Sequence, residues 1–275
     1  MSMFHRRGFL RFSSLALAGG TLPSQAAPPE RPRAKFQLGI GTYTFRSVDV
    51  DGLVARCREL GVGNIELSHP QYMLPQVKLE AIPALKEKLK AGRVQMHSYY
   101  CGHMRTRADL DRLQQVVEAM GVRQVSGSAE RELLPDVDRA CSSGGFRFGT
   151  HNHYFKGRKF LYESPHDLLS ALAGRSANFF VTLDTGHMIT CGFDPTEAYL
   201  KLQQHVRIIH LKDEDTPGHN VVLGKGKGDL GKFLQTIARE GFDGLAAIEY
   251  EEGTDPREEV AECVRFVREQ LRIKN

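Results

Sequence analysis

Tryptophan and long hydrophobic runs are both missing from this chain of 275 residues, which contains no Trp at all. The largest aromatic stacking surface is therefore unavailable to any ligand. No stretch supplies the ~20 consecutive apolar residues needed to cross a bilayer, which excludes an integral membrane protein. With 41% hydrophobic and 25% charged residues, the composition is that of a folded globular protein and excludes a disordered or coiled-coil chain.

An excess of positive charge is also missing once the first residues are set aside. The formal charge of +4 comes from 37 basic and 33 acidic residues, but Arg6, Arg7 and Arg11 lie within residues 1–26, which contain no acid. The remainder holds 34 basic against 33 acidic residues and has no basic run. Proteins that bind nucleic acids need a basic field to neutralise phosphates, so we expect no nucleic-acid partner.

Cysteine is sparse and widely spaced. The five cysteines are Cys57, Cys101, Cys141, Cys191 and Cys263. No Cys-x-x-Cys pair occurs, so neither a cysteine zinc site nor a disulfide scaffold is predicted, and the odd number leaves at least one free thiol. Cys57 and Cys263 fall on the apolar stripes of helical patterns, which predicts buried core thiols.

Glycine-rich nucleotide-binding motifs are missing as well. Gly39 and Gly41 lie inside an apolar run rather than at a strand-to-helix turn, so no Gly-x-Gly-x-x-Gly fingerprint is completed. The segment 224–228, Gly-Lys-Gly-Lys-Gly, lacks the Ser or Thr that follows Lys in a phosphate loop. We expect it to form a mobile loop.

The N-terminal segment has the features of a targeting signal. Arg6 and Arg7 precede a short apolar stretch, and small residues surround Ala26 and Ala27. The paired arginines before Phe-Leu resemble a twin-arginine signal, which implies export of a folded protein to the periplasm. We therefore predict a signal peptide over residues 1–26 and a proline-rich linker over 27–34.

From residue 35 onward, short apolar runs alternate with longer segments of helical period. The predicted strands are 36–42, 64–67, 94–97, 124–126, 146–151, 179–184, 206–210 and 246–249. Eight strand–helix units in ~240 residues match the size of a (β/α)8 barrel. We predict one α/β domain over 35–275, a parallel eight-stranded TIM barrel.

Polar residues able to bind metal recur where four successive apolar strands end, at His151, Asp184, His210 and Glu249. In a barrel the C-terminal ends of all strands meet at one mouth, so these side chains are expected to converge. Imidazoles together with carboxylates suit Zn²⁺, Mn²⁺ or Fe²⁺ better than Ca²⁺ or Mg²⁺. The sequence predicts that these four residues bind one divalent metal ion.

Three motifs carry a family resemblance: Asp184-Thr-Gly-His187, His210-Leu-Lys-Asp213 and Ile248-Glu-Tyr250. Together with Glu66 on the second strand and the His-Asn-His run at 151–153, they resemble the xylose isomerase-like TIM barrel superfamily over most of the chain after residue 35. The superfamily contains sugar isomerases, epimerases and inosose dehydratases. The resemblance implies that Asp184, His210 and Glu249 bind one metal ion and that His187 contacts substrate.

The chain departs from the epimerase pattern at one position. Many relatives have a glutamate just before Asn-His, and that glutamate both binds metal and moves protons. Here the position holds His151. Metal binding tolerates this exchange, whereas epimerisation by two carboxylates on opposite faces of the substrate depends on the missing glutamate.

The expected chemistry is enolisation. A metal ion held by a hydroxyl and an adjacent carbonyl acidifies the carbon-bound proton, and a protein base then removes it. The candidates for acid and base are Glu249, His187, Glu66, His97 and Lys212. Reprotonation of the enediolate gives isomerisation or epimerisation, and loss of a β-substituent gives dehydration or glycoside cleavage.

The sequence therefore favours a metal-dependent isomerase or epimerase of an unphosphorylated sugar or cyclitol. The alternatives are a keto-sugar lyase or dehydratase, and a non-catalytic sugar-binding barrel. A nuclease resembling the apurinic endonucleases shares the barrel but needs a basic surface that this chain lacks. The sequence sets neither the metal nor the oligomeric state.

Side chains beside these motifs carry three further expectations. Tyr99, Tyr100 and His103 follow the third predicted strand and are candidates for an aromatic wall. If its strand stays regular, His153 points away from the site, because side chains alternate along a strand. Glu251 is expected to be an ordinary surface charge.

Overall fold

A computed structural model describes residues 32–271 of the chain. The predicted signal peptide and most of the predicted linker lie outside the described residues. Within the described range, no helix is both long enough and apolar enough to cross a membrane.

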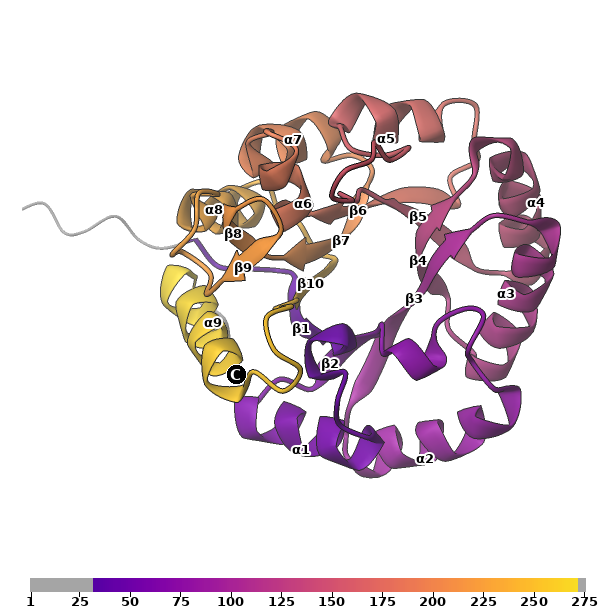
Figure 1. The fold of residues 1–275 in the computed structure, drawn as a ribbon, viewed down its shortest axis with the longest axis horizontal. Helices are drawn as coiled ribbons and strands as arrows, with labels where there is room; N and C mark the ends of the chain where they lie inside the picture. The colour runs from indigo at the N-terminus through magenta and orange to yellow at the C-terminus, as the bar shows by residue number, and fades with distance from the viewer. Residues whose placement is uncertain (1–31, 272–275) are drawn as a thin grey trace, which may run out of the picture. The chain divides into compact units, whose positions relative to one another are not determined.

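Eight parallel strands close into a barrel (Figure 1), which confirms the predicted fold. The barrel strands are β1 (Gln37–Gly41), β2 (Asn64–Leu67), β3 (Gln95–Met104), β4 (Gln124–Ala129), β5 (Arg147–His151), β6 (Phe179–Asp184), β7 (Val206–Leu211) and β10 (Leu245–Ile248). Neighbours follow the chain order from β1 to β7, and β10 lies between β7 and β1. Pairing of Gln37 with Leu245 begins the register that joins the first strand to the last.

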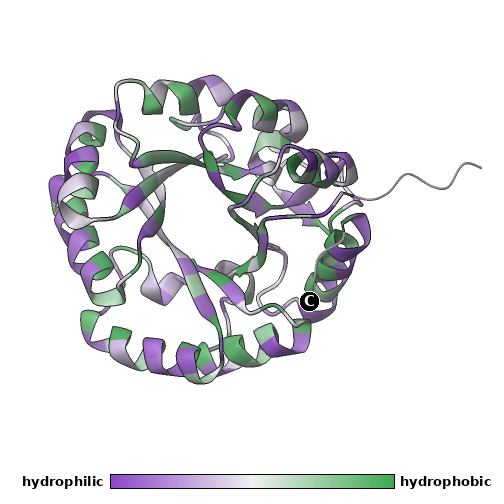
Figure 2. Cartoon of the chain, turned by 180° about the vertical axis from the view of Figure 1, so that it is seen from behind, coloured by the Kyte–Doolittle hydropathy of each residue, from purple (hydrophilic) through white to green (hydrophobic). Residues whose placement is uncertain are grey.

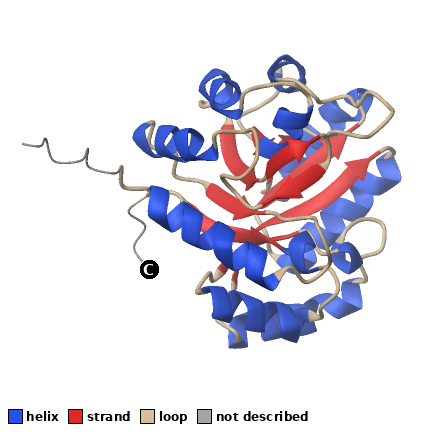
Figure 3. Cartoon of the chain, turned by 60° about the vertical axis from the view of Figure 1, so that its left-hand side comes forward, coloured by secondary structure: helices blue, strands red, loops and turns tan. Residues whose placement is uncertain are grey.

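Helices surround the strands (Figure 3). The α-helices are α1 (Val50–Leu60), α2 (Ile82–Ala91), α3 (Arg107–Met120), α4 (Leu134–Gly144), α5 (Pro165–Leu172), α6 (Thr185–Thr190), α7 (Pro195–Leu202), α8 (Leu230–Arg239) and α9 (Arg257–Gln270). Short 3-10 helices are η1 (Thr42–Phe45), η2 (Pro70–Tyr72), η3 (Leu79–Ala81) and η4 (Arg131–Leu133). The helices carry both hydrophilic and hydrophobic residues (Figure 2), as expected for elements with one face on a core and one in solvent.

Helix α3 shows how the sequence sets these elements. Its apolar residues at spacings of three and four, such as Leu110 and Leu113, are fully buried against the barrel. Thr106 and Asp109 form a reciprocal capping box that satisfies free amides at its start. Gly121 ends the helix in the left-handed conformation at φ 69°, which glycine adopts without steric cost.

The inside of the barrel changes from apolar to polar along the strands. Phe180, Ile208, Leu245 and Ala247 form a separate buried cluster. Because side chains alternate along a strand, the next positions on the same faces are Thr182 and Asp184, His210 and Lys212, and Glu249. The apolar layer therefore closes the amino end of the barrel, and polar side chains occupy its carboxyl end.

The structure also contains a hairpin that the sequence did not predict. Strands β8 (Asp213–Thr216) and β9 (His219–Val221) pair antiparallel directly after β7. Both are short and polar, so neither shows the apolar run or alternation that indicates a strand. Gly218 makes the reversal possible at φ 76°.

The segment 224–228 is anchored, in contrast to the mobile loop expected from its composition. The carboxylate of Asp213 accepts backbone N–H groups of Gly224, Gly226 and Gly228 at 2.9, 3.0 and 3.1 Å. A Cβ at Gly226 would lie 2.2 Å from Oδ1 of Asp213, so glycine is required for this close approach. The glycines thus allow the loop to wrap one carboxylate.

The cysteines behave as predicted for this part of the chain. All five are free thiols, and Cys57 and Cys263 are buried in the core.

Candidate functional site

A cavity of about 410 Å³ opens at the carboxyl ends of the strands. Five of the predicted site residues line it, namely His151, His187, His210, Lys212 and Glu249. Asp184 lies among them and is completely buried. The strand ends therefore bring together the residues that the sequence placed there.

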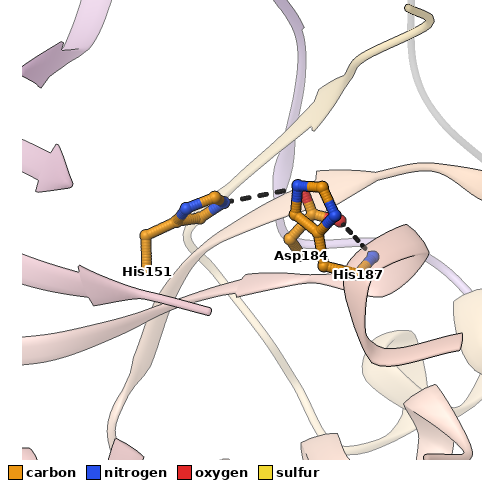
Figure 4. A group of neighbouring side chains, drawn as sticks. All are labelled: His151, Asp184 and His187. Carbon is orange, nitrogen blue, oxygen red and sulfur yellow. Dashed lines mark hydrogen bonds and ion pairs between the residues drawn. The ribbon is translucent and has the colours of Figure 1, made fainter. Parts of the chain in front are cut away.

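Asp184 ends β6 and uses its two oxygens differently. Oδ1 accepts the backbone N–H of His187 at 2.9 Å and so caps α6. Oδ2 lies 3.5 Å from Nε2 of His151 and 3.7 Å from Nε2 of His187. Figure 4 shows the rings of His151 and His187 beside this carboxylate.

The two middle residues of the Asp-Thr-Gly-His motif hold β7 in place. The hydroxyl of Thr185 donates to the carbonyl of Lys212 at 2.6 Å and accepts the Lys212 N–H at 2.9 Å. A Cβ at Gly186 would lie 2.6 Å from Cβ of Lys212, so only glycine leaves room for that side chain. The motif therefore fixes Asp184, His187 and Lys212 relative to one another.

Asn152 fixes Asp184 from the opposite side. Its amide donates to the carbonyl of Asp184 at 2.9 Å and accepts the Asp184 N–H at 2.8 Å. Asn152 is fully buried. This paired contact gives the middle residue of His151-Asn152-His153 a positioning role that the sequence alone did not assign.

His210 is oriented by Glu66. Nε2 of His210 donates to Oε2 of Glu66, while Ser98 donates to Oε1 of the same carboxylate at 2.8 Å. Nδ1 of His210 is left facing Oδ2 of Asp184 at 3.5 Å and Oε2 of Glu249 at 3.3 Å. Glu66 is fully buried and does not line the cavity, so it acts through His210.

Glu249 follows β10 and reaches the site across β1. A Cβ at Gly41 would lie 2.3 Å from Cγ of Glu249, so the first strand needs glycine at this point. Ser68 donates to Oε1 of Glu249 at 3.4 Å. The carboxylate after the last strand can therefore reach the site only because the first strand has no side chain at residue 41.

Lys212 lies between three carboxylates. Its Nζ is 3.0 Å from Asp184 Oδ2, 3.1 Å from Glu249 Oε2 and 2.6 Å from Glu251 Oε1. Burial opposes the positive charge, but these carboxylates outweigh it and raise the pKa of Lys212 well above its ordinary value. Lys212 is thus an ammonium ion whose side chain lines the cavity.

The pKa values of the histidines diverge according to their neighbours. Burial opposes the charge on His210, but Glu249 and Glu66 outweigh it and raise its pKa well above the ordinary value. Burial lowers the pKa of His151, and it lowers that of His187 well below the ordinary value. His151 and His187 are therefore neutral imidazoles near pH 7, the form that binds metal or accepts a proton.

The two innermost carboxyl groups stay ionised. Burial works against the charge of Asp184, but the ammonium of Lys212 and the protonated ring of His210 outweigh it and hold the pKa of Asp184 well below the ordinary range. Burial likewise opposes the charge of Glu66, and His210 with its hydrogen bonds lowers that pKa. Together with Glu249 and Glu251, four carboxylates face one ammonium and one imidazolium, which leaves negative charge for a divalent cation to balance.

The candidate ligand atoms suit a metal ion because several of them have no hydrogen-bond partner in the protein. Among the described residues, His151 Nε2, His187 Nε2 and His210 Nδ1 are buried without a hydrogen-bond partner, and all three face Oδ2 of Asp184, which pairs with the ammonium of Lys212. Buried polar atoms in this condition are rare and costly unless something else binds them. The candidate donors fall into two adjoining groups, one of His151, Asp184 and His187 and one of Glu66, His210 and Glu249. Nδ1 of His210 joins the groups at 3.5 Å from Asp184, and separations of 3.3 to 3.5 Å are those of neighbouring ligands around an ion at roughly 2.0–2.2 Å.

His97 is not brought to the cavity. Strand β3 runs on to Met104, so His97 lies near its amino end, half-buried, with Nε2 2.9 Å from Oδ1 of Asn64. Tyr100 and His103 of the same strand do line the cavity. Tyr99 is buried elsewhere and donates to the carbonyl of Tyr72 at 2.9 Å.

His153 and Glu251 were expected to lie outside the site, but both side chains line the cavity. β5 ends at His151, so alternation stops there, and the ring of His153 packs on that of His187 with centroids 4.1 Å apart. β10 likewise ends at Ile248, and Glu251 turns inward to pair with Lys212. Irregular backbone after the strands thus adds both groups to the site.

Comparison with solved structures finds the same fold in sugar epimerases and in a dehydratase. A 3-keto-D-glucoside 4-epimerase from E. coli is 13% identical over 86% of this chain and 100% of its own, with a TM-score of 0.70. A D-allulose 3-epimerase from Methylomonas is 16% identical over 88% and 100%, with a TM-score of 0.66. A probable 3-DHS dehydratase from Bacillus anthracis is 16% identical over 85% and 99%, with a TM-score of 0.68.

These identities establish the fold and not the reaction. No curated protein matches the sequence. The model of one protein family matches residues 54–270, which span seven of the eight barrel strands. The chain belongs to the family of xylose isomerase-like TIM barrels.

Proposed function

We propose that this protein is a divalent-metal-dependent isomerase or epimerase that acts on a sugar or cyclitol through enolisation. The observation that carries the proposal is the set of buried imidazole nitrogens without partners on His151, His187 and His210, which surround the carboxylate of Asp184 beside Glu249. The epimerases among the similar structures support it.

The metal ligands in this proposal are His151, Asp184, His210 and Glu249, and Zn²⁺, Mn²⁺ or Fe²⁺ suits this mixture of nitrogen and oxygen donors. When bound, such an ion polarises a substrate carbonyl and so acidifies the neighbouring C–H bond. His187 lies beside Asp184 and remains available to contact substrate.

The chain's own groups divide the remaining work. Neutral His187 lines the cavity and can accept a proton from substrate carbon or return one. The ammonium of Lys212, also in the lining, can stabilise negative charge that develops on a substrate oxygen. Glu249 offers its carboxylate as a second base, and Glu66 keeps the ring of His210 in orientation.

A second candidate reaction is the loss of a β-substituent, as in a keto-sugar lyase or dehydratase. One feature of the sequence favours it: His151 occupies the position to which the family resemblance assigns a proton-moving glutamate. Elimination starts from the same enediolate and needs a proton donor to the leaving group rather than a base on the opposite face. The dehydratase among the similar structures is consistent with this branch.

Proton NMR in D₂O tests the proposal. Purified protein is incubated with ketoses, aldoses, inososes and 3-keto-glycosides, with and without a chelator. We expect deuterium to enter the substrate carbon next to the carbonyl, the chelator to stop it, and Asp184→Asn to abolish it. The product distinguishes isomerase, epimerase and lyase. Absence of exchange with every substrate, accompanied by saturable sugar binding, would instead indicate a non-catalytic sugar-binding barrel.

We further propose that the protein is exported to the periplasm by the twin-arginine route. The support is the sequence of residues 1–26 alone, with Arg6 and Arg7 ahead of Phe9. A reporter fused behind these residues should reach the periplasm of a bacterium with the twin-arginine translocase. Export that persists after Arg6→Lys and Arg7→Lys, or in a host without the translocase, would contradict this route.

A further inference from the structure

A second and larger cavity adjoins the site. It measures about 740 Å³, and Tyr43 and Met73 line both this cavity and the site cavity. At about 410 Å³ the site cavity is near the small end of the roughly 300–1,000 Å³ that ligand pockets span. The two cavities therefore meet at these two side chains, and a ligand that passes them has room beyond one sugar ring.

This second cavity, which we call the side recess, is formed by η1 and the segment after β2. Its lining includes Tyr43, Tyr72, Met73, Gln71, Gln76 and Lys78. Two aromatic rings and a thioether suit the C–H face of a ring, and two amides can both donate to and accept from hydroxyls. No carboxylate and a single lysine lie among its described lining residues, so a neutral, hydroxylated ring matches it better than a charged group.

The shared wall of the recess is fixed relative to the candidate metal ligands. Ser68 accepts the backbone N–H of Tyr43 at 2.9 Å and donates its hydroxyl proton to Oε1 of Glu249 at 3.4 Å. The guanidinium of Arg46 lies 4.8 Å from the centroid of the Tyr43 ring and restrains it. Ser68 thus connects the backbone at Tyr43 to the carboxylate of Glu249.

We propose that the substrate contains two linked rings, of which the keto or ketose ring occupies the site cavity and a neutral second sugar ring occupies the side recess. This inference rests on the proposed function, because it names the class of substrate for the same site. The substrates it selects are ketose disaccharides and related glycosides rather than free monosaccharides.

The test compares one-ring and two-ring ketoses. Deuterium exchange is measured with D-fructose and with maltulose, lactulose and isomaltulose, in which a second hexose is linked to fructose. We expect kcat/KM for at least one disaccharide to exceed that for fructose by tenfold or more. Ala81→Trp, which places a large ring in the recess, should reduce this ratio at least tenfold. Ala177→Trp is the matched control, since Ala177 is exposed just before β6 at the opposite end of the barrel.

Binding of sugars that cannot enolise separates this proposal from the proposed function. Maltitol should bind more tightly than sorbitol by calorimetry, and Ala81→Trp should remove the difference while circular dichroism shows the variant folded. Such binding without any deuterium exchange would support a second-ring site in the side recess and would overturn the proposed enolisation. Exchange that is equal for fructose and all disaccharides, and is unaffected by Ala81→Trp, would overturn the two-ring substrate and leave the chemistry intact.

Discussion

Nε2 of His210 donates to Oε2 of Glu66, and this contact decides which nitrogen of the ring faces the cavity. With Nε2 used in this way, Nδ1 is the atom that approaches Asp184 and Glu249. The carboxylate also supports the positive charge of the ring in the absence of metal. Glu66 is therefore a positioning residue, although the sequence offered it as an acid or base.

Glu66→Gln should weaken metal binding by roughly 10–100-fold, the usual effect of removing a carboxylate behind a ligating histidine. The amide keeps the size of the side chain but can present its NH₂ to Nε2 and so favour the wrong tautomer of His210. Metal affinity is measured by competition with a chromogenic chelator. His97→Gln serves as the control, because His97 contacts Asn64 away from the cavity. Equal affinities in the Glu66 and His97 variants would contradict the positioning role.

His151→Glu should retain metal and shift the products toward epimers. The substitution places a second carboxylate beside Asp184, where Nε2 of His151 now lies 3.5 Å from Oδ2. A carboxylate there can exchange a proton with the face of the substrate opposite to the first base. Products are identified by NMR. The matched variant His151→Gln, which cannot carry a proton in this way, should show no shift, and unchanged products in both variants would remove His151 as the determinant.

Asp213→Asn should destabilise the fold by about 1–3 kcal/mol, measured by urea unfolding. Asp213 accepts three loop amides from Gly224, Gly226 and Gly228, and the new NH₂ group would face one or more of these donors. Asp215→Asn provides the comparison, since Asp215 is exposed and, within residues 32–271, pairs only with the nearby His219 and Thr216. A similar loss of stability in both variants would mean that the carboxylate does not anchor the loop.

Glu214 should make the stability depend on pH. Burial raises the pKa of Glu214 from its ordinary 4.5 to about 7. The folded state therefore holds this proton more tightly than the unfolded state, so the contribution is complete below about pH 4.5 and is lost as the pH rises through about 7. In Glu214→Gln the free energy of unfolding should fall less between pH 5 and pH 8, by roughly 1–3 kcal/mol. Parallel pH profiles for the two proteins would show that Glu214 does not titrate as a buried acid.

The sequence predicted the barrel and the convergence of Asp184, His210 and Glu249 because both depend on strand ends. Strand β6 was predicted with its observed bounds, and β7 to within one residue, and inside-facing positions follow from alternation. His97 was misplaced for the same reason: β3 continues to Met104, so its carboxyl end lies seven residues further on. Polar residues at strand ends can thus be placed in the site only where the end of the strand itself is predicted correctly.

Side chains in irregular backbone escaped prediction. His153 and Glu251 follow strands that have already ended, so alternation does not apply to them. Asn152 and Ser68 act through hydrogen bonds to backbone groups or a carboxylate distant in sequence. The glycine inside the first strand did carry a signal, since an unneeded glycine in a strand often marks a close approach.

The lack of a side chain at Gly41 also links the site to the pairing of the first and last barrel strands. Glu249 directly follows the last strand, and its side chain fits against the first strand because residue 41 is glycine. Pairing of those two strands closes the barrel. A barrel in which β1 and β10 are not paired can still hold Asp184 and His210 together, because β6 and β7 are neighbours, but it does not hold Glu249 in place as the fourth metal ligand. A metal ion that requires Glu249 therefore binds the closed barrel in preference to the open one. Its affinity should depend on the stability of the β1–β10 pairing.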